Sequence, residues 1–303
     1  MPPMSQTCPF NSLAYAAGQG HLGLPDSSSC TGLTILRRPV PPIAQVGLGT
    51  DAADGIGPWP YVWIRGDEDL QSLHTDFPHL VTLSVVTQPG YRPPREAVDA
   101  PALKDHYVYD PSLPAPRWST RTRARIAAAE VRGTFAVTRS PDRVVQMAEL
   151  YHRFVERRGL VGAYVDFGPP FFATVAGLES GYFFEVRDTE GVAAMACGVV
   201  FEDMLQVLHT ASSDDGLRWS ASYLLMAGMQ DFARERGLRM LTGGLPAGGR
   251  PGLARFKARW ANTMVPVHLL RIVNDRQRYD EICAAVGSTR TGFFPAYRAG
   301  VVS

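Results

Sequence analysis

One short stretch, residues 252–260, combines a lysine with apolar and aromatic residues. It reads GLARFKARW and follows a loop rich in glycine and proline. Lys257 is one of only two lysines in the chain, the other being Lys104, among 30 lysine and arginine residues. Because a lysine ammonium is a compact point charge, Lys257 is suited to stabilise an oxygen that becomes negative during a reaction. Lys257 is therefore the candidate catalytic residue. The alternative is a basic amphipathic helix that packs its aromatic residues into the core.

A polar loop offers a second set of candidate residues. Residues 209–216, HTASSDDG, lie between a predicted strand and a predicted helix. Such a loop collects backbone N–H donors and the partial positive charge of the helix start, which suits it to hold an anion. The same residue types also cap helices and form turns, and a histidine here equally suits an ordinary strand position. The candidate substrate-binding residues are His209, Ser212, Asp214 and Tyr223, and none of them stands out as a general base.

Arginine is concentrated in two segments, although the net charge of the chain is only +1. Residues 117–143 hold seven arginines, and nine basic residues lie between 243 and 303. Such segments fit a polyanionic ligand, either a nucleic-acid backbone or a phosphorylated cofactor. The alternative is a solvated helix face whose arginine stems cover apolar surface. The candidate anion-binding residues are Arg121, Arg123, Arg125, Arg255 and Arg259.

Hydrophobic periodicity predicts the elements that carry these residues. A helix is predicted over 220–236, with Ser220 or Ser222 as its N-cap. A second amphipathic helix is predicted over 141–158, closed by Gly159. The predicted strands are 182–187, 192–201, 204–210, 238–241 and 265–273. Together these elements form a mixed, mostly antiparallel sheet flanked by helices, which is an α/β (α+β) fold.

The first part of the chain has weaker patterns. Residues 1–58 are rich in glycine, proline and serine, and we expect them to be partly irregular. Strands are predicted over 61–65 and 80–87, with a short helix over 67–76 between them. With a further strand over 106–110, these elements make a smaller α/β unit.

Composition excludes several classes of protein. The chain has 303 residues, 45% of them hydrophobic, which is enough for one or two globular domains. No run of 18 apolar residues and no signal-peptide pattern occurs, so a cytoplasmic location without a membrane partner is expected. The four cysteines are far apart and form no C-x-x-C pair, so no metal or redox site is expected.

The stretch from the long predicted helix to Trp260 resembles a known enzyme family. A helix with paired leucines is followed by Gly-x-Arg, by Gly-Gly and by Gly-Leu-x-x-Phe-Lys-x-x-Trp. This pattern is similar to the acyltransferase domain of FemAB-like proteins, which belong to the wider GNAT N-acyltransferase superfamily. The resemblance extends back to the basic segment 119–133 and forward to residues 293–298. It covers residues 105–303, and the Phe-Lys pair is its most specific part.

The resemblance implies a fold of two tandem GNAT-like domains, the first of them degenerate. The expected domains are residues 1–138, including the irregular N-terminal segment, and residues 139–303, the acyltransferase domain. The resemblance also implies that Lys257 stabilises the donor ester or oxyanion and that Phe256 packs on the donor. FemAB-like proteins use aminoacyl-tRNA, so the resemblance implies this co-substrate and no tightly bound cofactor.

The identity of the acyl donor depends on the loop before the long helix. Most GNAT domains that use acyl-CoA carry Arg/Gln-x-x-Gly-x-Gly/Ala there, whereas residues 213–221 read SDDGLRWSA. Its two aspartates disfavour a pyrophosphate, and the helix start partly offsets them. The long helical hairpin of some cell-wall members is also missing, which favours a small-molecule amine over a peptidoglycan precursor as acceptor.

The sequence therefore predicts an amide-forming N-acyltransferase. In the first hypothesis it moves an aminoacyl group from aminoacyl-tRNA to a small-molecule amine in specialised metabolism. The second hypothesis is an acyl-CoA-dependent GNAT N-acyltransferase of the same fold. The third is a non-catalytic binding module on a GNAT scaffold. Neither DNA nor a membrane is expected as a partner.

Overall fold

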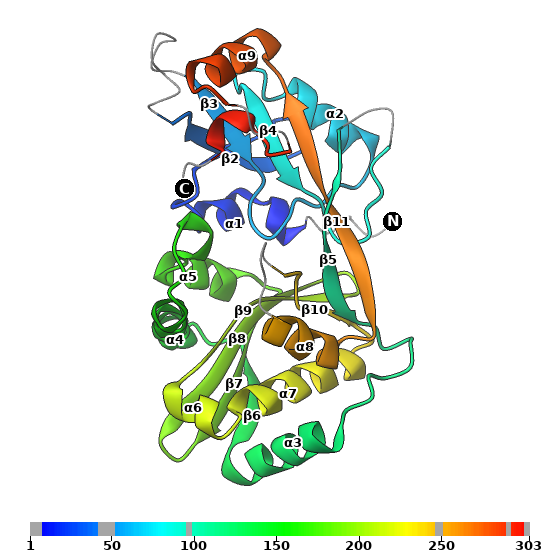
Figure 1. Cartoon of the computed structure of the whole chain (residues 1–303). Helices are drawn as coiled ribbons and strands as arrows, with labels where there is room; N and C mark the ends of the chain where they lie inside the picture. Colours follow the sequence, from blue (N-terminus) through cyan, green and yellow to red (C-terminus); the bar gives the residue numbers. More distant parts are fainter. Residues whose placement is uncertain (1–7, 42–51, 95–98, 246–250, 289–291, 300–303) are drawn as a thin grey trace. The chain divides into compact units, whose positions relative to one another are not determined.

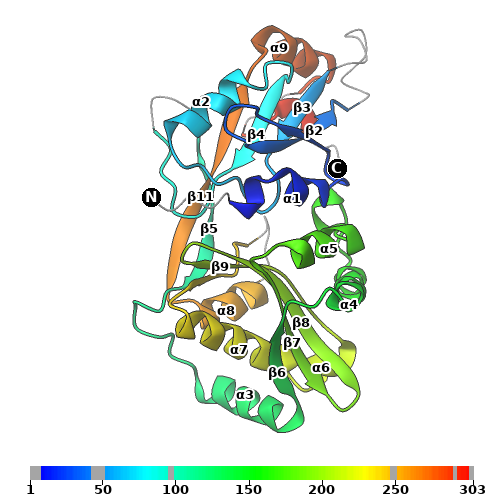
Figure 2. The ribbon, with the colours of Figure 1, turned by 180° about the vertical axis from the view of Figure 1, so that it is seen from behind.

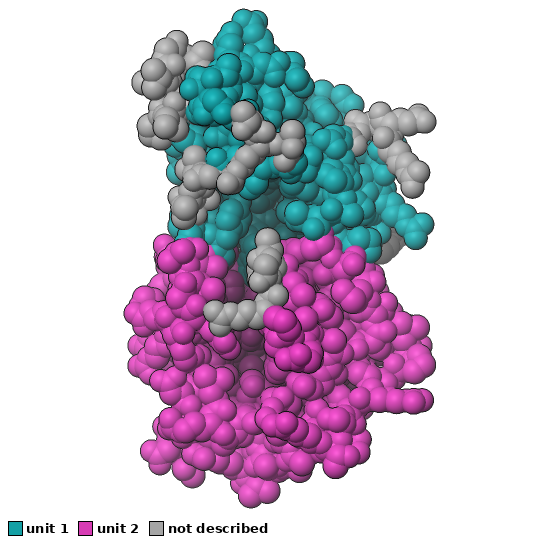
Figure 3. Space-filling model, in the orientation of Figure 1, with its two compact units in different colours: residues 1–103, 162–164, 266–303 teal, residues 104–161, 165–265 magenta. Residues whose placement is uncertain are grey.

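The computed structural model describes residues 8–41, 52–94, 99–245, 251–288 and 292–299. Two compact units make up the chain, and Figure 3 colours them separately. Unit 1 consists of Met1–Leu103, Gly162–Tyr164 and Pro266–Ser303, and unit 2 consists of Lys104–Val161 and Val165–Val265.

These bounds differ from the boundary expected between residues 138 and 139. The C-terminal segment belongs to unit 1 because Leu269–Val273 pairs with a strand of that unit. The strand around His106, expected in the first unit, belongs to unit 2 because Tyr109 and Val108 pair with the sheet of that unit.

Unit 1 is built on a five-stranded sheet in the order β1-β2-β3-β4-β11 (Figure 1). Neighbouring strands are antiparallel except for β3 and β4, which are parallel. Its helices are α1 (Leu13–Ala17), α2 (Asp67–Thr75) and α9 (Arg276–Ala285), with short 3-10 turns at Pro9–Asn11 and Ala296–Arg298. The strands are β1 (Leu24–Ser27), β2 (Thr34–Pro39), β3 (Ala53–Ile56), β4 (Thr82–Val86) and β11 (Thr263–Val273).

The stretch expected to be partly irregular, residues 1–58, also contributes three strands of unit 1 that the sequence pattern did not predict. Ile35, Leu36 and Ile56 are buried in these strands, so apolar burial outweighs the glycine and proline content. The strand expected over 61–65 is reduced to an isolated bridge between Val62 and Thr87.

The C-terminus is tied to unit 1 through a buried polar cluster. The Tyr297 hydroxyl donates to Asp54 Oδ2 at 3.1 Å and lies 2.9 Å from Thr82 Oγ1. Asp54 is fully buried and is paired with both Arg38 and Arg298. Since a buried carboxylate needs partners, this cluster requires the C-terminal residues to fold with β2 and β3.

Unit 2 is built on a second sheet, in the order β5-β10-β9-β8-β7-β6. Strands β9 and β10 are parallel, and the other neighbours are antiparallel. The predicted meander of three strands is confirmed as β7 to β9. The strands are β5 (Ala102–Tyr109), β6 (Thr134–Thr138), β7 (Gly181–Asp188), β8 (Gly191–Phe201), β9 (Met204–Ser212) and β10 (Arg239–Leu241).

Helices cover both faces of the unit 2 sheet. Figures 1 and 2 show α7 on one face, with α3 beside it, and α4 and α5 on the other. Helix α4 ends at Gly159, whose φ of 59° is the left-handed conformation expected from the sequence. The helices are α3 (Thr120–Arg132), α4 (Arg143–Arg158), α5 (Pro169–Gly177), α6 (Asp214–Arg218), α7 (Ala221–Glu235) and α8 (Pro251–Trp260), with a 3-10 turn at Ala163–Val165.

Candidate active site

The parallel strands β9 and β10 separate at their carboxyl ends, and this end of the strands defines the site. Their register runs to the pair Gln206 and Leu241, after which β9 continues to Ser212 paired with β8. The chain after β10 pairs instead with β5, where Thr242 N donates to Tyr107 O at 3.0 Å. Ligands of open α/β sheets bind at the carboxyl ends of strands, where neighbouring connections diverge. We therefore place the site at this end of β10.

Lys257 projects from α8 to this end of β10. Its Nζ donates to the carbonyl oxygens of Thr242 and, at 2.9 Å, of Gly244. Gly243 between them has a φ of 74°, a conformation that a residue with a side chain rarely adopts. Within the part of the chain that the structure describes, no carboxylate forms an ion pair with Lys257, so two neutral carbonyls hold an uncompensated positive charge.

The second lysine of the chain, Lys104, lies close enough to Lys257 to affect its pKa. Burial, together with the positive charge of Lys104 on β5, lowers the pKa of Lys257 to about 8. The pKa of His106 is lowered to about 3 by burial and by both lysines. His106 is therefore a neutral imidazole at pH 7, and its Nδ1 has no hydrogen-bond partner among the described residues. Sequence reasoning missed Lys104 and His106 as site residues because it assigned their strand to the other unit.

Phe256 packs into the core of unit 2. Its ring lies edge-on to those of Tyr223 and Trp260, at centroid distances of 5.9 and 6.1 Å. Trp260 is fully buried and Phe256 is half-buried. The observed contacts of Phe256 are thus those of the packed-helix alternative.

Three arginines and Tyr223 form a second feature of unit 2, which we call the arginine pocket. Arg125 Nη1 and Arg259 Nη1 both donate to the Tyr223 hydroxyl, at 2.6 and 3.0 Å. Both guanidinium groups also lie over its ring, 5.0 and 5.2 Å from the centroid. The pocket has a volume of about 240 Å³ and is lined by Ser119, Arg121, Thr122, Arg125, Tyr223 and Arg259.

The arginine pocket is suited to an anion. No carboxylate lines it, so within the pocket Arg125 and Arg259 meet the Tyr223 hydroxyl but no negative charge. The pocket also lies at the start of α3, where Ser119 Oγ accepts from the Thr122 amide at 3.2 Å. A phosphate here would meet three guanidinium groups and the positive end of a helix.

Two of the predicted anion-binding residues lie outside the arginine pocket. Arg123 donates to the Trp118 carbonyl and to Thr120 Oγ1. Its guanidinium therefore bonds to residues at the N-terminus of its own helix, α3. Arg255 is exposed on the first half of α8.

The polar loop after β9 does not join either group of residues. Asp214 forms an ion pair of 2.8 Å with Arg157, which also donates to the Ser212 carbonyl. Asp215 is paired with Arg132 and Arg218. The loop carboxylates are thus engaged by arginines of unit 2.

His209 lies on the opposite face of the sheet from α7. A register shift in the β8–β9 pairing skips Leu208 and turns His209 towards α4 and α5. Its ring centroid is 4.4 Å from that of Tyr151 and 4.6 Å from that of Phe167. His209 is buried within this group of aromatic rings.

Comparison with known proteins supports the fold. Residues 117–258 match the family model of the acetyltransferase (GNAT) domain. The structure of FemX is 12% identical and has a TM-score of 0.60, with 88% of this chain and 92% of that chain covered. No curated protein sequence is significantly similar to the chain.

Two further solved structures share the fold. The C-terminal domain of a putative lysylphosphatidylglycerol synthetase from Agrobacterium fabrum is 17% identical, with a TM-score of 0.56 and coverage of 89% of this chain and 90% of that chain. L-PGS from Bacillus licheniformis is 14% identical, with a TM-score of 0.56 and coverage of 91% of each chain.

The protein therefore has a FemX-like fold built on a GNAT domain, and it is an acyltransferase. Among the residues described, no helix combines the length and the apolar character needed to cross a bilayer.

Proposed function

We propose that the protein transfers an aminoacyl group from aminoacyl-tRNA to the amine of a small molecule, as part of specialised metabolism. The observation that carries the proposal is the arginine pocket, in which Arg121, Arg125 and Arg259 converge without a carboxylate. A nucleic-acid backbone needs such a basic surface, whereas a CoA pyrophosphate is held in most GNAT domains by a loop that is missing here. The FemAB-like resemblance implies the same donor.

The proposed chemistry needs one electrostatic group from unit 2. The amine nitrogen attacks the ester carbonyl carbon, the new C–N bond forms, and the C–O bond to the ribose breaks. The proton lost by the amine goes to the departing ribose oxygen. Negative charge develops on the carbonyl oxygen before the C–O bond breaks, and the ammonium of Lys257 is proposed to stabilise it. His106 is a poor general base at pH 7, since its pKa is about 3.

The second candidate is an acyl-CoA-dependent N-acyltransferase of the same fold. The divergence of β9 and β10 beyond Gln206 and Leu241 favours it, because an extended pantetheine arm fits between parting strands. The loop at residues 213–221 argues against it. Its amide at Gly216 is already bonded to Ser213 Oγ at 2.9 Å and is therefore not available to a pyrophosphate.

The two candidates are separated by changing the donor. The protein is incubated with a panel of amines and either radiolabelled aminoacyl-tRNA or acyl-CoA thioesters. We expect labelled amide only from aminoacyl-tRNA, and none after RNase treatment of the donor. Transfer that survives RNase, or a thermal shift produced by micromolar acyl-CoA, would establish the second candidate instead.

A further inference from the structure

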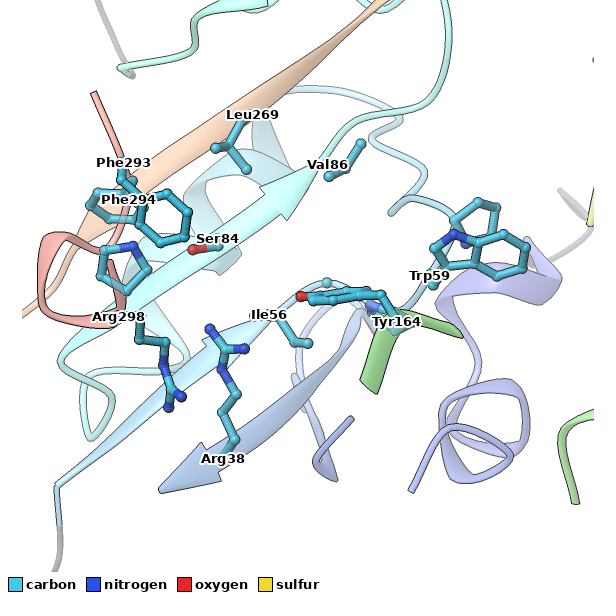
Figure 4. Close-up of a pocket in the computed structure, with 14 residues that line it drawn as sticks. Arg38, Ile56, Trp59, Ser84, Val86, Tyr164, Leu269, Phe293, Phe294 and Arg298 are labelled. Carbon is cyan, nitrogen blue, oxygen red and sulfur yellow. The ribbon is translucent and has the colours of Figure 1, made fainter. Parts of the chain in front are cut away.

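Unit 1 contains a pocket that no step of the proposed reaction uses. It has a volume of about 190 Å³ and lies at the carboxyl ends of β3 and β4, the parallel pair of that unit (Figure 4). Ile56 and Ser84, which pair across these strands, form part of its floor. In unit 2 the candidate active site occupies the corresponding place beside the parallel pair β9 and β10. A ligand site is expected at such a position in an α/β sheet.

Aromatic side chains make the walls of this pocket. Four of them line it, namely Trp59, Tyr164, Phe293 and Phe294. The backbone of Trp59 is fixed on both sides by the buried side chain of Gln19, which accepts from its amide and donates to its carbonyl, each at 2.8 Å. The backbone that carries Trp59 is therefore held in place before any ligand arrives, which lowers the entropy cost of binding.

The polar end of the pocket is cationic. Arg38 and Arg298 both line the pocket and share one buried carboxylate, Asp54, so one positive charge remains uncompensated. Arg38 uses only its Nε for Asp54, at 2.6 Å, and its two Nη atoms make no hydrogen bond to any described residue. Figure 4 shows its guanidinium beside Ile56 and below Phe294. No carboxylate lines the pocket itself.

A hydroxyl group in the pocket also lacks a partner. Ser84 Oγ is buried and makes no hydrogen bond to any described residue. Leaving such a group unsatisfied costs about 1–3 kcal/mol, so a ligand atom that reached it would remove that penalty.

We propose that this pocket binds a small aromatic carboxylate. An apolar cavity of about 150 Å³ holds a benzene ring, so the volume here fits one ring with a carboxyl group. The ring would lie against Tyr164, and the carboxylate would accept from the Nη atoms of Arg38 in a two-point bond. The excess positive charge selects against amines, and the volume selects against nucleotides. This inference is independent of the proposed aminoacyl transfer.

The test measures binding rather than activity, with benzoate as the probe. Isothermal titration calorimetry of the full chain is expected to show one saturable site with a Kd of about 1 mM or below. Benzamide, which has the ring but no charge, is expected to bind at least about tenfold more weakly, because a hydrogen bond to a charged group is lost. Acetate, which has the charge but no ring, should be weaker as well.

Matched variants locate the site. Arg38→Met is expected to weaken benzoate binding at least about tenfold, while Asp54 keeps Arg298 as its partner. Arg37→Met, on the same strand but exposed, is expected to bind as the wild type does. If Arg38→Met does not fold, Tyr164→Ala tests the site instead. This variant removes an exposed residue of the pocket wall and should also weaken benzoate binding. The proposal is overturned by no saturable binding at about 10 mM benzoate, by equal affinity for benzamide, or by equal losses in Arg37→Met and in the pocket variants.

Discussion

The ammonium of Lys257 is held by two backbone carbonyls and has no described carboxylate partner. If it stabilises the oxyanion, Lys257→Ala should lower kcat by about 100-fold or more. Lys257→Arg should restore little of the lost kcat, because a planar guanidinium group cannot occupy the position of a compact ammonium group. Single-turnover assays at saturating donor measure both effects, and the melting temperature reports whether the fold survives. Near-normal turnover in Lys257→Ala would show that α8 is only a packed helix.

The lowered pKa of Lys257 predicts that kcat and stability change in opposite directions as pH rises. Because its pKa is about 8, the charged form is lost as pH rises through 8, and kcat at saturating substrates should fall there. Stability should change in the other direction. Between pH 8 and the ordinary lysine pKa of about 10.4, the unfolded chain binds more protons than the native one, so the contribution of Lys257 to stability rises with pH. In Lys257→Arg the residual kcat should no longer fall near pH 8, because arginine stays charged; an unchanged profile would exclude Lys257 as the origin of the fall.

Arg259 shares the Tyr223 hydroxyl with Arg125 and lines the arginine pocket. Arg259→Ala should weaken aminoacyl-tRNA binding and lower the slope of log K against log salt by about 1, with a much smaller effect on the chemical step. Arg255→Ala is also expected to weaken binding, but less, because this side chain lies outside the pocket on the same helix. Filter binding at several salt concentrations provides both slopes. An unchanged slope in Arg259→Ala would remove the pocket from the tRNA surface.

At the scale of elements, helix α6 lies closely against β8. A Cβ added at Gly216 would come within 2.1 Å of the Ala193 carbonyl oxygen, and this neighbour is backbone. Gly216→Ala should therefore destabilise the protein by about 1–3 kcal/mol, the usual cost of overpacking. Gly177→Ala is the control, because nothing lies within 4 Å of the added atom. It should be neutral or slightly stabilising in urea unfolding. Equal effects of the two changes would contradict the close contact.

At the scale of the whole molecule, Asp54 connects β3 with the C-terminal residues of unit 1. Asp54→Ala would leave Arg38 and Arg298 without their shared carboxylate, and we expect a loss of about 3–5 kcal/mol in the free energy of unfolding. Asp280→Ala removes an exposed pair with Arg276 and should cost at most about 1 kcal/mol. Urea unfolding followed by circular dichroism compares them, and a small loss in Asp54→Ala would mean that the cluster contributes little.

The sequence by itself determined most local elements of unit 2. The long helix predicted over 220–236 is observed as Ala221–Glu235, and Lys257 and Phe256 lie on a helix as expected. These predictions hold because helical and strand periodicity are local properties of the chain. The predicted capping of the long helix is not observed, since Ser220 makes no side-chain capping bond. The same reasoning did not predict the short strands within residues 1–58, which are stabilised by burial that involves distant parts of the chain.

Only the tertiary structure decided which residues meet. Lys104 and His106 lie far from Lys257 in the sequence, and they come together because β5 pairs with β10. His209 follows Val207 by two residues, so strand alternation would place both on one face, but the register shift at Leu208 separates them. Strand order and bulges depend on the packing of the whole sheet, and no single segment encodes them.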